Sequence, residues 1–346
     1  MNEALKSDLS VLVTGGAGFI GSNLVHTLLL KKEVSRLVVL DSLTYSGCRG
    51  NLIKAEQNEK FSFAEIDLRD VTAVSDLVCD EEFDAVFHLA AESHVDRSIT
   101  GPSVFVETNV VGTINLLEAC RAAWKGVFEN KRFLHVSTDE VFGSLGSYGA
   151  FTEDSPYRPN SPYSASKAGA DHLVRAYNMT YGFPAMITNC SNNFGPFQFP
   201  EKLIPLVIDR AVNKERIPVY GDGSNVRDWI YVADHVSALW AAFRKGEVGE
   251  SYNIGGGNEW PNLQVVETIC DLVDSRLGRE SQETRQLISM VKDRPGHDFR
   301  YAIDPTKCHQ TLGWRPEYEF KEALEATVTW YLENQPWVEL VQGQSD

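Results

Sequence analysis

Several features that would place this sequence in a special class are missing. Positively charged residues are few: 32 Lys and Arg stand against 48 Asp and Glu, and the formal charge is -16. This balance argues against a nucleic-acid-binding surface or a polybasic membrane anchor. No window approaches the ~18 apolar residues of a membrane helix, and the N-terminus MNEALKSDLS lacks the apolar core of a secretory signal. These absences predict a soluble, cytoplasmic protein that binds neither nucleic acid nor membrane.

Cysteine is also scarce, and its spacing is unlike that of a metal site. No CxxC pair occurs, and His94 with Asp96 has no third ligand at a useful spacing, so we predict no metal. With 43% apolar and 23% charged residues, the composition is that of an ordinary globular protein. Reduced thiols are expected at Cys48, Cys79, Cys120, Cys190, Cys270 and Cys308.

Apolar runs of strand length alternate with segments of helical period through the first half of the chain. Near-continuous apolar runs are typical of parallel strands that are covered on both faces. One long helix is predicted over about 103–124. The fold class predicted is α/β, a Rossmann-type doubly wound parallel sheet. The six predicted strands span residues 10–15, 36–41, 61–67, 84–91, 132–138 and 184–191.

After about residue 192, prolines and glycine-rich stretches such as GDGSN and NIGGGN indicate shorter elements and a second, smaller region. We therefore divide the chain into a Rossmann domain over 1–191 and a C-terminal region over 192–346. The boundary is approximate, and the chain is free to cross between the two. Because no linker separates them, a cleft is expected between them at the carboxyl ends of the strands.

A glycine-rich turn follows the first strand and precedes a helix. Gly15, Gly18 and Gly21 allow close approach to a pyrophosphate, which the helix N-terminus attracts. Asp41 ends the second strand 20 residues after Gly21, where a carboxylate bonds the ribose hydroxyls and repels a 2′-phosphate, so NAD is favoured over NADP. The alternative is that the glycines only permit a tight turn and Asp41 caps a loop. Asp67, which ends the third strand, either holds the adenine edge or is a helix N-cap.

Tyr163 and Lys167 lie four residues apart just after Pro162, so both project from one face of a helix. An ammonium beside a phenol is expected to lower the pKa of the tyrosine from about 10 and make it a base for a hydroxyl proton. The predicted cofactor contacts are Gly15, Gly18, Phe19, Ile20, Gly21, Asp41, Asp67, Leu68, Ala90, Tyr163 and Lys167.

With these motifs the sequence resembles the extended short-chain dehydrogenase/reductase family, and within it the dTDP-glucose 4,6-dehydratases over nearly the whole chain. The resemblance implies NAD as cofactor, dTDP-glucose as substrate, a nucleotide-sugar site in residues 192–346, and a homodimer formed by the long helix and the Tyr163 helix. The matching stretches are VLVTGGAGFIGSNLV, LAAESHVDRSI, HVSTDEVFG, SPYSASKAGADHLV, TNCSNNFGPFQFPEKLIP, RDWIYVADH, YNIGG and DRPGHDFRYAID.

Thr138, Asp139 and Glu140 end the fifth strand. A dehydratase must remove the proton at sugar carbon 5 and protonate the hydroxyl that leaves carbon 6, which two carboxyl groups in different protonation states can do. By the resemblance Glu140 is the base, Asp139 is the acid and Thr138 bonds the oxygen at carbon 4. The alternative is that the two acidic residues form a solvated pair that caps a loop.

A nucleotide-diphosphate sugar brings negative charge into an acidic protein, so fixed donors are needed. Taken singly, such residues are more often part of the surface. Arg227 is the strongest candidate, because its stem is expected to be buried beside Trp229 with the guanidinium fork free for a phosphate. The predicted substrate contacts are Ser93, Asn192, Lys202, Arg227, Asn262, Arg294 and His297.

Other functions stay open at this point. A nucleotide-sugar 4-epimerase, or a dehydratase of a UDP- or GDP-linked sugar, would have the same fold. A non-catalytic NAD-binding regulator is a more remote alternative, since such proteins typically lose the Tyr or Lys that this chain keeps.

Overall fold

The structure, a computed structural model, describes residues 6–293 and 296–343. Its main sheet has seven strands in the order β10-β6-β5-β4-β1-β2-β3, and every neighbouring pair is parallel. The Rossmann-type prediction is confirmed, and each predicted strand lies where it was expected. The strands are β1 (Leu9–Thr14), β2 (Val34–Asp41), β3 (Phe61–Glu65), β4 (Ala85–His88), β5 (Arg132–Thr138), β6 (Ala185–Cys190) and β10 (Ser251–Ile254).

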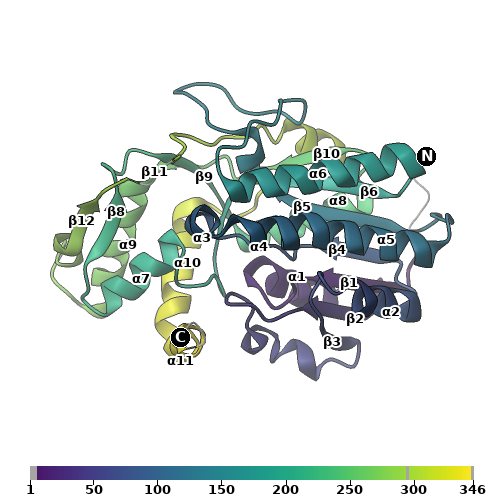
Figure 1. Cartoon of the computed structure of the whole chain (residues 1–346). Helices are drawn as coiled ribbons and strands as arrows, with labels where there is room; N and C mark the ends of the chain where they lie inside the picture. The colour runs from purple at the N-terminus through teal and green to yellow at the C-terminus, as the bar shows by residue number, and fades with distance from the viewer. Residues whose placement is uncertain (1–5, 294–295, 344–346) are drawn as a thin grey trace.

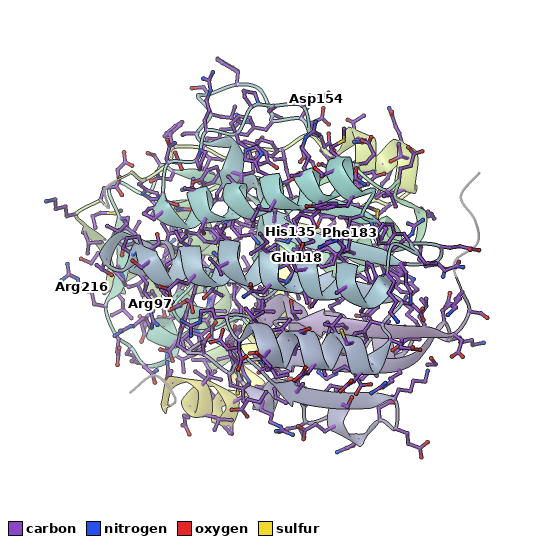
Figure 2. All side chains as sticks on the ribbon, turned by 45° about the vertical axis from the view of Figure 1, so that its right-hand side comes forward. Arg97, Glu118, His135, Asp154, Phe183 and Arg216 are labelled. Atoms are coloured by element: carbon purple, nitrogen blue, oxygen red, sulfur yellow. The ribbon has the colours of Figure 1, made fainter. Side chains whose placement is uncertain are left out.

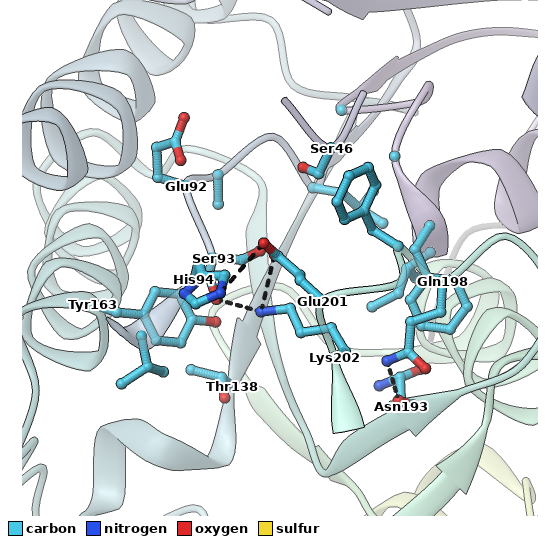
Figure 3. A pocket seen from close by; sticks show the side chains of 18 of the residues that line it. Ser46, Glu92, Ser93, His94, Thr138, Tyr163, Asn193, Gln198, Glu201 and Lys202 are labelled. Carbon is cyan, nitrogen blue, oxygen red and sulfur yellow. Dashed lines mark hydrogen bonds and ion pairs between the residues drawn. The ribbon is translucent and has the colours of Figure 1, made fainter. Parts of the chain in front are cut away.

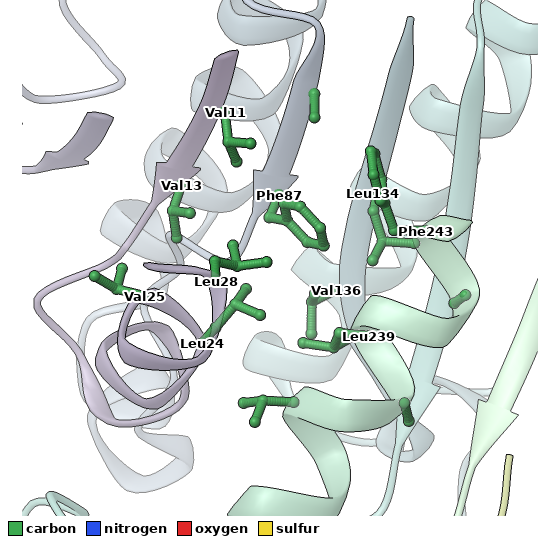
Figure 4. Close-up of a cluster of buried hydrophobic side chains, with 14 of the residues drawn as sticks. Val11, Val13, Leu24, Val25, Leu28, Phe87, Leu134, Val136, Leu239 and Phe243 are labelled. Carbon is green, nitrogen blue, oxygen red and sulfur yellow. The ribbon is translucent and has the colours of Figure 1, made fainter. Parts of the chain in front are cut away.

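Helices cover both faces of this sheet. On one face lie α1 (Phe19–Leu29) and α8 (Val232–Lys245); Leu24 and Leu28 of α1 meet Leu239 of α8 in a buried apolar cluster (Figure 4). On the other face lie α2 (Val71–Glu81), α5 (Gly112–Trp124) and α6 (Pro162–Tyr181). Because strand side chains alternate between faces, each strand except β10 contributes to both cores, which explains the near-continuous apolar runs.

Helices α5 and α6 run side by side across the sheet (Figure 1). Tyr177 of α6 donates a hydrogen bond to Glu118 of α5. Figure 2 labels Glu118, His135 and Phe183 where the two helices cover the sheet.

The helix predicted over about 103–124 is confirmed as one continuous helical run, which contains a wider turn. After α3 (Val95–Thr100) come α4 (Pro102–Val106), a π-helical turn at Glu107–Val111, and α5. The turn places the buried Asn109 so that its amide nitrogen donates to the Glu92 carbonyl at 3.0 Å and the Ser166 hydroxyl at 2.8 Å. The π turn therefore ties the helix to α6 and to the loop after β4.

The smaller region contains two further sheets. The three-stranded sheet has β7 (Asn192–Phe194), β9 (Val226–Tyr231) and β11 (Glu259–Pro261), and the two-stranded sheet pairs β8 (Ile217–Tyr220) with β12 (Ile288–Val291). Its helices are α7 (Leu203–Val212), α9 (Asn262–Leu277), α10 (Phe320–Glu333) and α11 (Gln335–Gly343). Short helical turns lie at Arg49–Leu52, Ala55–Gln57, Asp139–Phe142, Thr284–Leu287 and Cys308–Leu312.

The expectation of shorter elements after residue 192 is wrong for the helices. Helices α8, α9 and α10 have 14, 16 and 14 residues, and the prolines and glycines lie mostly in the loops between elements. The chain also crosses back, because α8 and β10 follow residue 192 and yet pack on or extend the main sheet.

All six cysteines are unpaired; Cys79 is exposed and the others are buried. In the described ranges, no helix combines the length and the apolar character needed to cross a membrane.

Candidate active site

A cavity of about 550 Å³ opens at the carboxyl ends of the strands, around the point where the strand order reverses between β1 and β4. Arg294 lies outside the described residues. The other predicted site residues all line this one cavity, although they come from distant parts of the sequence: Gly15, Gly18, Phe19, Ile20, Gly21, Asp41, Asp67, Leu68, Ala90, Ser93, Thr138, Asp139, Glu140, Tyr163, Lys167, Asn192, Lys202, Arg227, Asn262 and His297.

The glycine turn forms a cradle that larger residues would fill. Gly15 has φ +70°, and a Cβ there would lie 2.6 Å from the Ala90 amide nitrogen. A Cβ on Gly21 would lie 2.0 Å from the Gly15 carbonyl oxygen. No side chain caps the start of α1, and its first residues line the cavity. The cradle therefore fits the pyrophosphate of a dinucleotide.

Asp41 is 8% exposed and holds the neighbouring loops. Its two oxygens accept from the backbone N–H groups of Ala17 and Leu43, each at 2.9 Å, and burial raises the pKa of this carboxyl. The loop-capping alternative is thus part of what Asp41 does. The same carboxylate lines the cavity and retains acceptor capacity for ribose hydroxyls.

Asp67 is not a helix cap. The cap of α2 is Asp70, whose carboxylate accepts from the Ala73 N–H at 3.0 Å. Asp67 pairs instead with Arg69, with the Nη2 and Oδ2 atoms 2.6 Å apart, and this guanidinium holds the pKa of Asp67 below its usual value. The N-cap alternative is therefore wrong.

Helix α6 begins in a way that fixes Tyr163 and Lys167. The Ser161 hydroxyl accepts from the Ser164 N–H at 3.0 Å, while the Ser164 hydroxyl accepts from the Ser161 N–H at 3.1 Å. Pro162 occupies the first helical position. This capping box confirms the predicted helix start and sets both side chains on the cavity side.

The expected effect of Lys167 on the Tyr163 pKa is wrong for this structure. The Lys167 ammonium donates to the Val136 carbonyl at 2.8 Å, and burial lowers the pKa of the lysine. Burial and the nearby Glu140 carboxyl raise the pKa of Tyr163 well above 10. A hydrogen bond with Thr138 lowers this pKa, but by less than burial and Glu140 raise it. The reason is that the spacing placed both groups on one face without fixing where the ammonium points.

Asp139 is 2% exposed, so the solvated-pair alternative is wrong for this residue. The Thr138 hydroxyl lies 3.4 Å from Asp139 Oδ1, and Oδ2 has no hydrogen-bond partner. Burial, followed by the charges of Glu140 and Asp228, raises the pKa of Asp139 well above its usual range. Burial therefore favours the neutral, protonated form of Asp139, whereas the Glu140 side chain is only partly buried.

The expectation that the Arg227 guanidinium is free is wrong. Its Nη1 donates to the carbonyls of Val226 at 2.8 Å and Phe299 at 3.3 Å, and its Nη2 donates to the Asp298 carbonyl at 2.9 Å. The guanidinium also stacks 4.5 Å from the centre of the Tyr301 ring. Arg227 is 4% exposed and still lines the cavity, so the carbonyls that hold it also fix its direction.

The remaining predicted substrate contacts supply polar atoms. The side-chain oxygens of Asn192 and Asn262 are buried without a hydrogen-bond partner. The Lys202 ammonium donates to the Ser93 carbonyl at 3.0 Å. His297 Nδ1 lies 2.6 Å from Asp293 Oδ1.

Sequence reasoning missed a charged cluster in the same cavity. Glu201 lies 3.3 Å from His94 Nε2 and 3.9 Å from the Lys202 ammonium (Figure 3). Burial and the Glu201 carboxylate raise the pKa of the Tyr45 phenol. The Arg97 guanidinium stacks on the ring of Tyr45, with its central carbon 3.8 Å from the ring centre. Glu201 directly precedes Lys202 in a proline-flanked stretch, which was a usable signal; nothing around Tyr45 marks that residue.

His88 is a core histidine. Its ring nitrogens lie 2.7 Å from the Thr14 hydroxyl and 2.9 Å from the Thr113 hydroxyl. Among the residues that the structure describes, no group of three or more His, Cys, Asp or Glu side chains is arranged to hold a metal ion.

Comparison with known proteins places this site in a family. Residues 12–327 match the family model described as GDP-mannose 4,6 dehydratase. The chain belongs to this family.

Proteins similar to this chain include dehydratases and, at lower identity, epimerases. A dTDP-glucose 4,6-dehydratase of Xanthomonas campestris pv. campestris strain B100 is 54% identical over 333 residues, 95% of this chain and 94% of that protein. The crystal structure of DesIV, a dTDP-glucose 4,6-dehydratase of Streptomyces venezuelae with NAD bound, is 45% identical, with a TM-score of 0.89 over 96% of this chain and 100% of that one. A UDP-glucose 4-epimerase of Thermus thermophilus in complex with NAD is 30% identical, with a TM-score of 0.82 over 94% and 100% of the two chains.

Proposed function

We propose that this chain is an NAD-dependent dTDP-glucose 4,6-dehydratase, which converts dTDP-glucose into dTDP-4-keto-6-deoxy-glucose and water. The observation that carries the proposal is the pair Asp139 and Glu140 in the cavity that Tyr163 also lines; Asp139 is buried, which favours its protonated form, and Glu140 is more open. The relatives at 54% and 45% identity have this activity in their names.

NAD, when bound, supplies the acceptor for the hydride of carbon 4, returns that hydride to carbon 6, and adds a positive ring charge. The glycine cradle holds its pyrophosphate, and Asp41 accepts from its adenosine ribose. Tyr163 takes the proton of the hydroxyl at carbon 4, while Thr138 bonds the same oxygen. Because burial and Glu140 raise the pKa of Tyr163, positive charge near the phenol is needed to make it a base.

Elimination then falls to the two carboxyl groups. Glu140 removes the proton at carbon 5, which the ketone at carbon 4 has made acidic, and later returns a proton to that carbon. Asp139 donates its proton to the hydroxyl that leaves carbon 6 as water. Tyr163 has gained one proton and Asp139 has lost one, so transfer of a proton between them resets the site.

The charge of the diphosphate is met on the other side of the cavity. Arg227 and Lys202 supply fixed positive charge, and the unpartnered oxygens of Asn192 and Asn262 accept from the nucleoside or sugar. The functional division that we propose follows from this: residues 1–191 carry the dinucleotide and the reaction, and residues 192–346 carry most contacts to the nucleotide sugar.

Two rival activities share this fold, and the first of them fits the site less well. A 4-epimerase needs only the Tyr and Lys, and would have no use for a buried Asp139 that favours its protonated form. A dehydratase of a UDP- or GDP-linked sugar would share the carboxyl pair and differ only in the base contacts.

The test is to incubate the purified protein with dTDP-, UDP-, GDP- and CDP-hexoses without added reductant and to measure product mass. We expect dTDP-glucose to lose one water. A separate sample of the purified protein, once denatured, should release NAD rather than NADP. Conversion of none of the sugars would refute the proposal, and a product of unchanged mass with inverted carbon 4 would identify an epimerase.

A cytoplasmic homodimer is part of the same proposal. The six unpaired thiols support a reducing compartment.

Helices α3 to α6 expose apolar side chains that a second copy would cover. They are Ile99, Val106, Val111, Met179 and Tyr181, each at least 41% exposed. Light scattering should give twice the chain mass, and a monomer would contradict the dimer.

A further inference from the structure

A chain of hydrogen bonds joins the C-terminal helix to the glycine cradle. The indole N–H of Trp337, in α11, donates to Asn51 Oδ1 at 2.7 Å, and the Asn51 amide nitrogen donates to the Ala17 carbonyl at 2.8 Å. The Cys48 N–H donates to the same carbonyl at 3.0 Å. Since the Ala17 N–H donates to Asp41, the residue between the cradle glycines is held at both its N–H and its carbonyl.

The ring of the same tryptophan packs on a second loop. Phe197 lies with its ring centre 5.8 Å from Trp337 and 5.0 Å from Trp330. The backbone φ of Phe197 is +69°. Residues other than glycine rarely adopt such an angle unless their surroundings impose it. The next residue, Gln198, lines the cavity with a buried, unpartnered Oε1, and its carbonyl accepts from the Tyr331 hydroxyl.

Trp337 thus has two separable contacts: its N–H leads to the cradle, and its ring leads to the loop that carries Gln198. Figure 1 shows α10 running along the boundary between the two regions to α11. Neither Trp337 nor Asn51 is among the residues that line the cavity, so both act through others.

We propose that Trp337 is a positioning residue that sets the dinucleotide cradle through Asn51 and the loop that carries Gln198 through Phe197. The inference rests on the proposed function for the identity of the two ligands. The C-terminal helix is then part of the binding apparatus and not only a cover for the apolar core of the smaller region.

The first experiment removes only the N–H. Trp337→Phe keeps an aromatic ring, so the affinity for NAD should fall about threefold to tenfold, the worth of one buried hydrogen bond, while KM for dTDP-glucose changes less than twofold. The control is Trp314→Phe, which removes an indole bond of equal length, 2.7 Å to the Ser237 hydroxyl, away from the cavity. It should leave the NAD affinity within twofold.

The second experiment removes the other arm. Tyr331→Phe deletes the hydroxyl that holds the Gln198 carbonyl, and should raise KM while leaving the NAD affinity unchanged. In Asn51→Ala combined with Trp337→Phe, the loss of NAD affinity should equal that of Asn51→Ala alone, because one chain of bonds is broken twice.

Amide hydrogen exchange of residues 15–23, measured on the protein without ligand, gives a readout that does not depend on the proposed function. Exchange there should quicken in Trp337→Phe and not in Trp314→Phe. Unchanged exchange and NAD affinity in a folded Trp337→Phe, or equal losses in the control, would overturn the inference. If the wild type fails to convert dTDP-glucose, the proposed function fails while the exchange result still decides this inference.

Discussion

The two sides of the cavity are built differently. On the dinucleotide side, polar groups are satisfied within the protein, as where both oxygens of Asp41 accept backbone N–H groups. On the sugar side, the side-chain oxygens of Asn192 and Asn262 are buried without a hydrogen-bond partner. The first side is set by short-range turns before any ligand arrives, whereas the second gains its partners from the ligand.

Between the two sides lie the reacting groups, where burial dominates. It raises the pKa values of Asp139 and Tyr163 and lowers that of Lys167. Each of these groups is therefore pushed toward its neutral form. The contrast predicts that substitutions on the dinucleotide side change cofactor choice, those on the sugar side change KM, and those between them stop single chemical steps.

The largest effect is expected for Tyr163→Phe. Loss of the base should slow oxidation at carbon 4 by about 10²–10⁴-fold, so that adding dTDP-glucose leaves the near-ultraviolet absorbance of the bound dinucleotide unchanged. Tyr157→Phe is the matched control, because that hydroxyl donates to Asp171 at 2.9 Å behind the cavity. Normal oxidation by Tyr163→Phe would remove the tyrosine from the mechanism.

Arg227→Ala should act on binding. Losing a charge-assisted phosphate contact costs about 1.5–3 kcal/mol, which is roughly a tenfold to hundredfold rise in KM. Arg300→Ala, which loses a 2.9 Å bond to the Gly149 carbonyl and an ion pair with Glu259 outside the cavity, controls for general loosening. If KM and kcat both stay at their wild-type values, Arg227 has no part in substrate binding.

Asp139→Asn should stabilise the fold in a pH-dependent way. The folded protein holds the Asp139 proton more tightly than the unfolded chain, whose Asp has a pKa of about 3.9. Stability contributed by this group therefore falls as pH rises above about 3.9 toward the folded pKa. The gain from Asp139→Asn should be larger near pH 8 than near pH 4, by about 1.4 kcal/mol per unit of raised pKa. Denaturant unfolding at the two pH values measures it, and an equal gain would mean that Asp139 is not buried as a neutral acid.

The smallest effect is expected at the cofactor end. Asp41→Asn keeps an oxygen acceptor and removes the charge that repels a 2′-phosphate, so the preference for NAD over NADP should fall at least about fivefold, since charges 4 Å apart are worth about 1 kcal/mol even in water. Calorimetric titration of both dinucleotides gives the ratio. An unchanged ratio would assign the discrimination to another group.

The same contrast explains what the sequence could predict. The strands, the glycine cradle and the start of α6 each carry a pattern that can be recognised within a short stretch of sequence, and the structure has them where the pattern placed them. The direction of a long side chain depends on distant backbone. Lys167 turns to Val136 and Arg227 to Asp298 and Phe299, contacts that span 31 to 72 residues of sequence.

The cluster around Glu201 was missed for the same reason. His94 and Glu201 are 107 positions apart and meet only because the loop after β4 faces the loop before α7. Residue types in such loops show no periodicity, so the contact between His94 and Glu201 becomes visible only in three dimensions, although the proline-flanked stretch around Glu201 was a usable signal.

The central claim is that oxidation at carbon 4 and elimination across carbons 5 and 6 use different groups. Glu140→Gln tests it most directly, in deuterated solvent with dTDP-glucose and the NAD-loaded protein. The account predicts that the absorbance of the bound dinucleotide still changes, while water loss and deuterium entry at carbon 5 fall by about 10²–10⁴-fold. Dehydration by Glu140→Gln at a rate near that of the wild type would contradict the assignment of the two carboxyl groups.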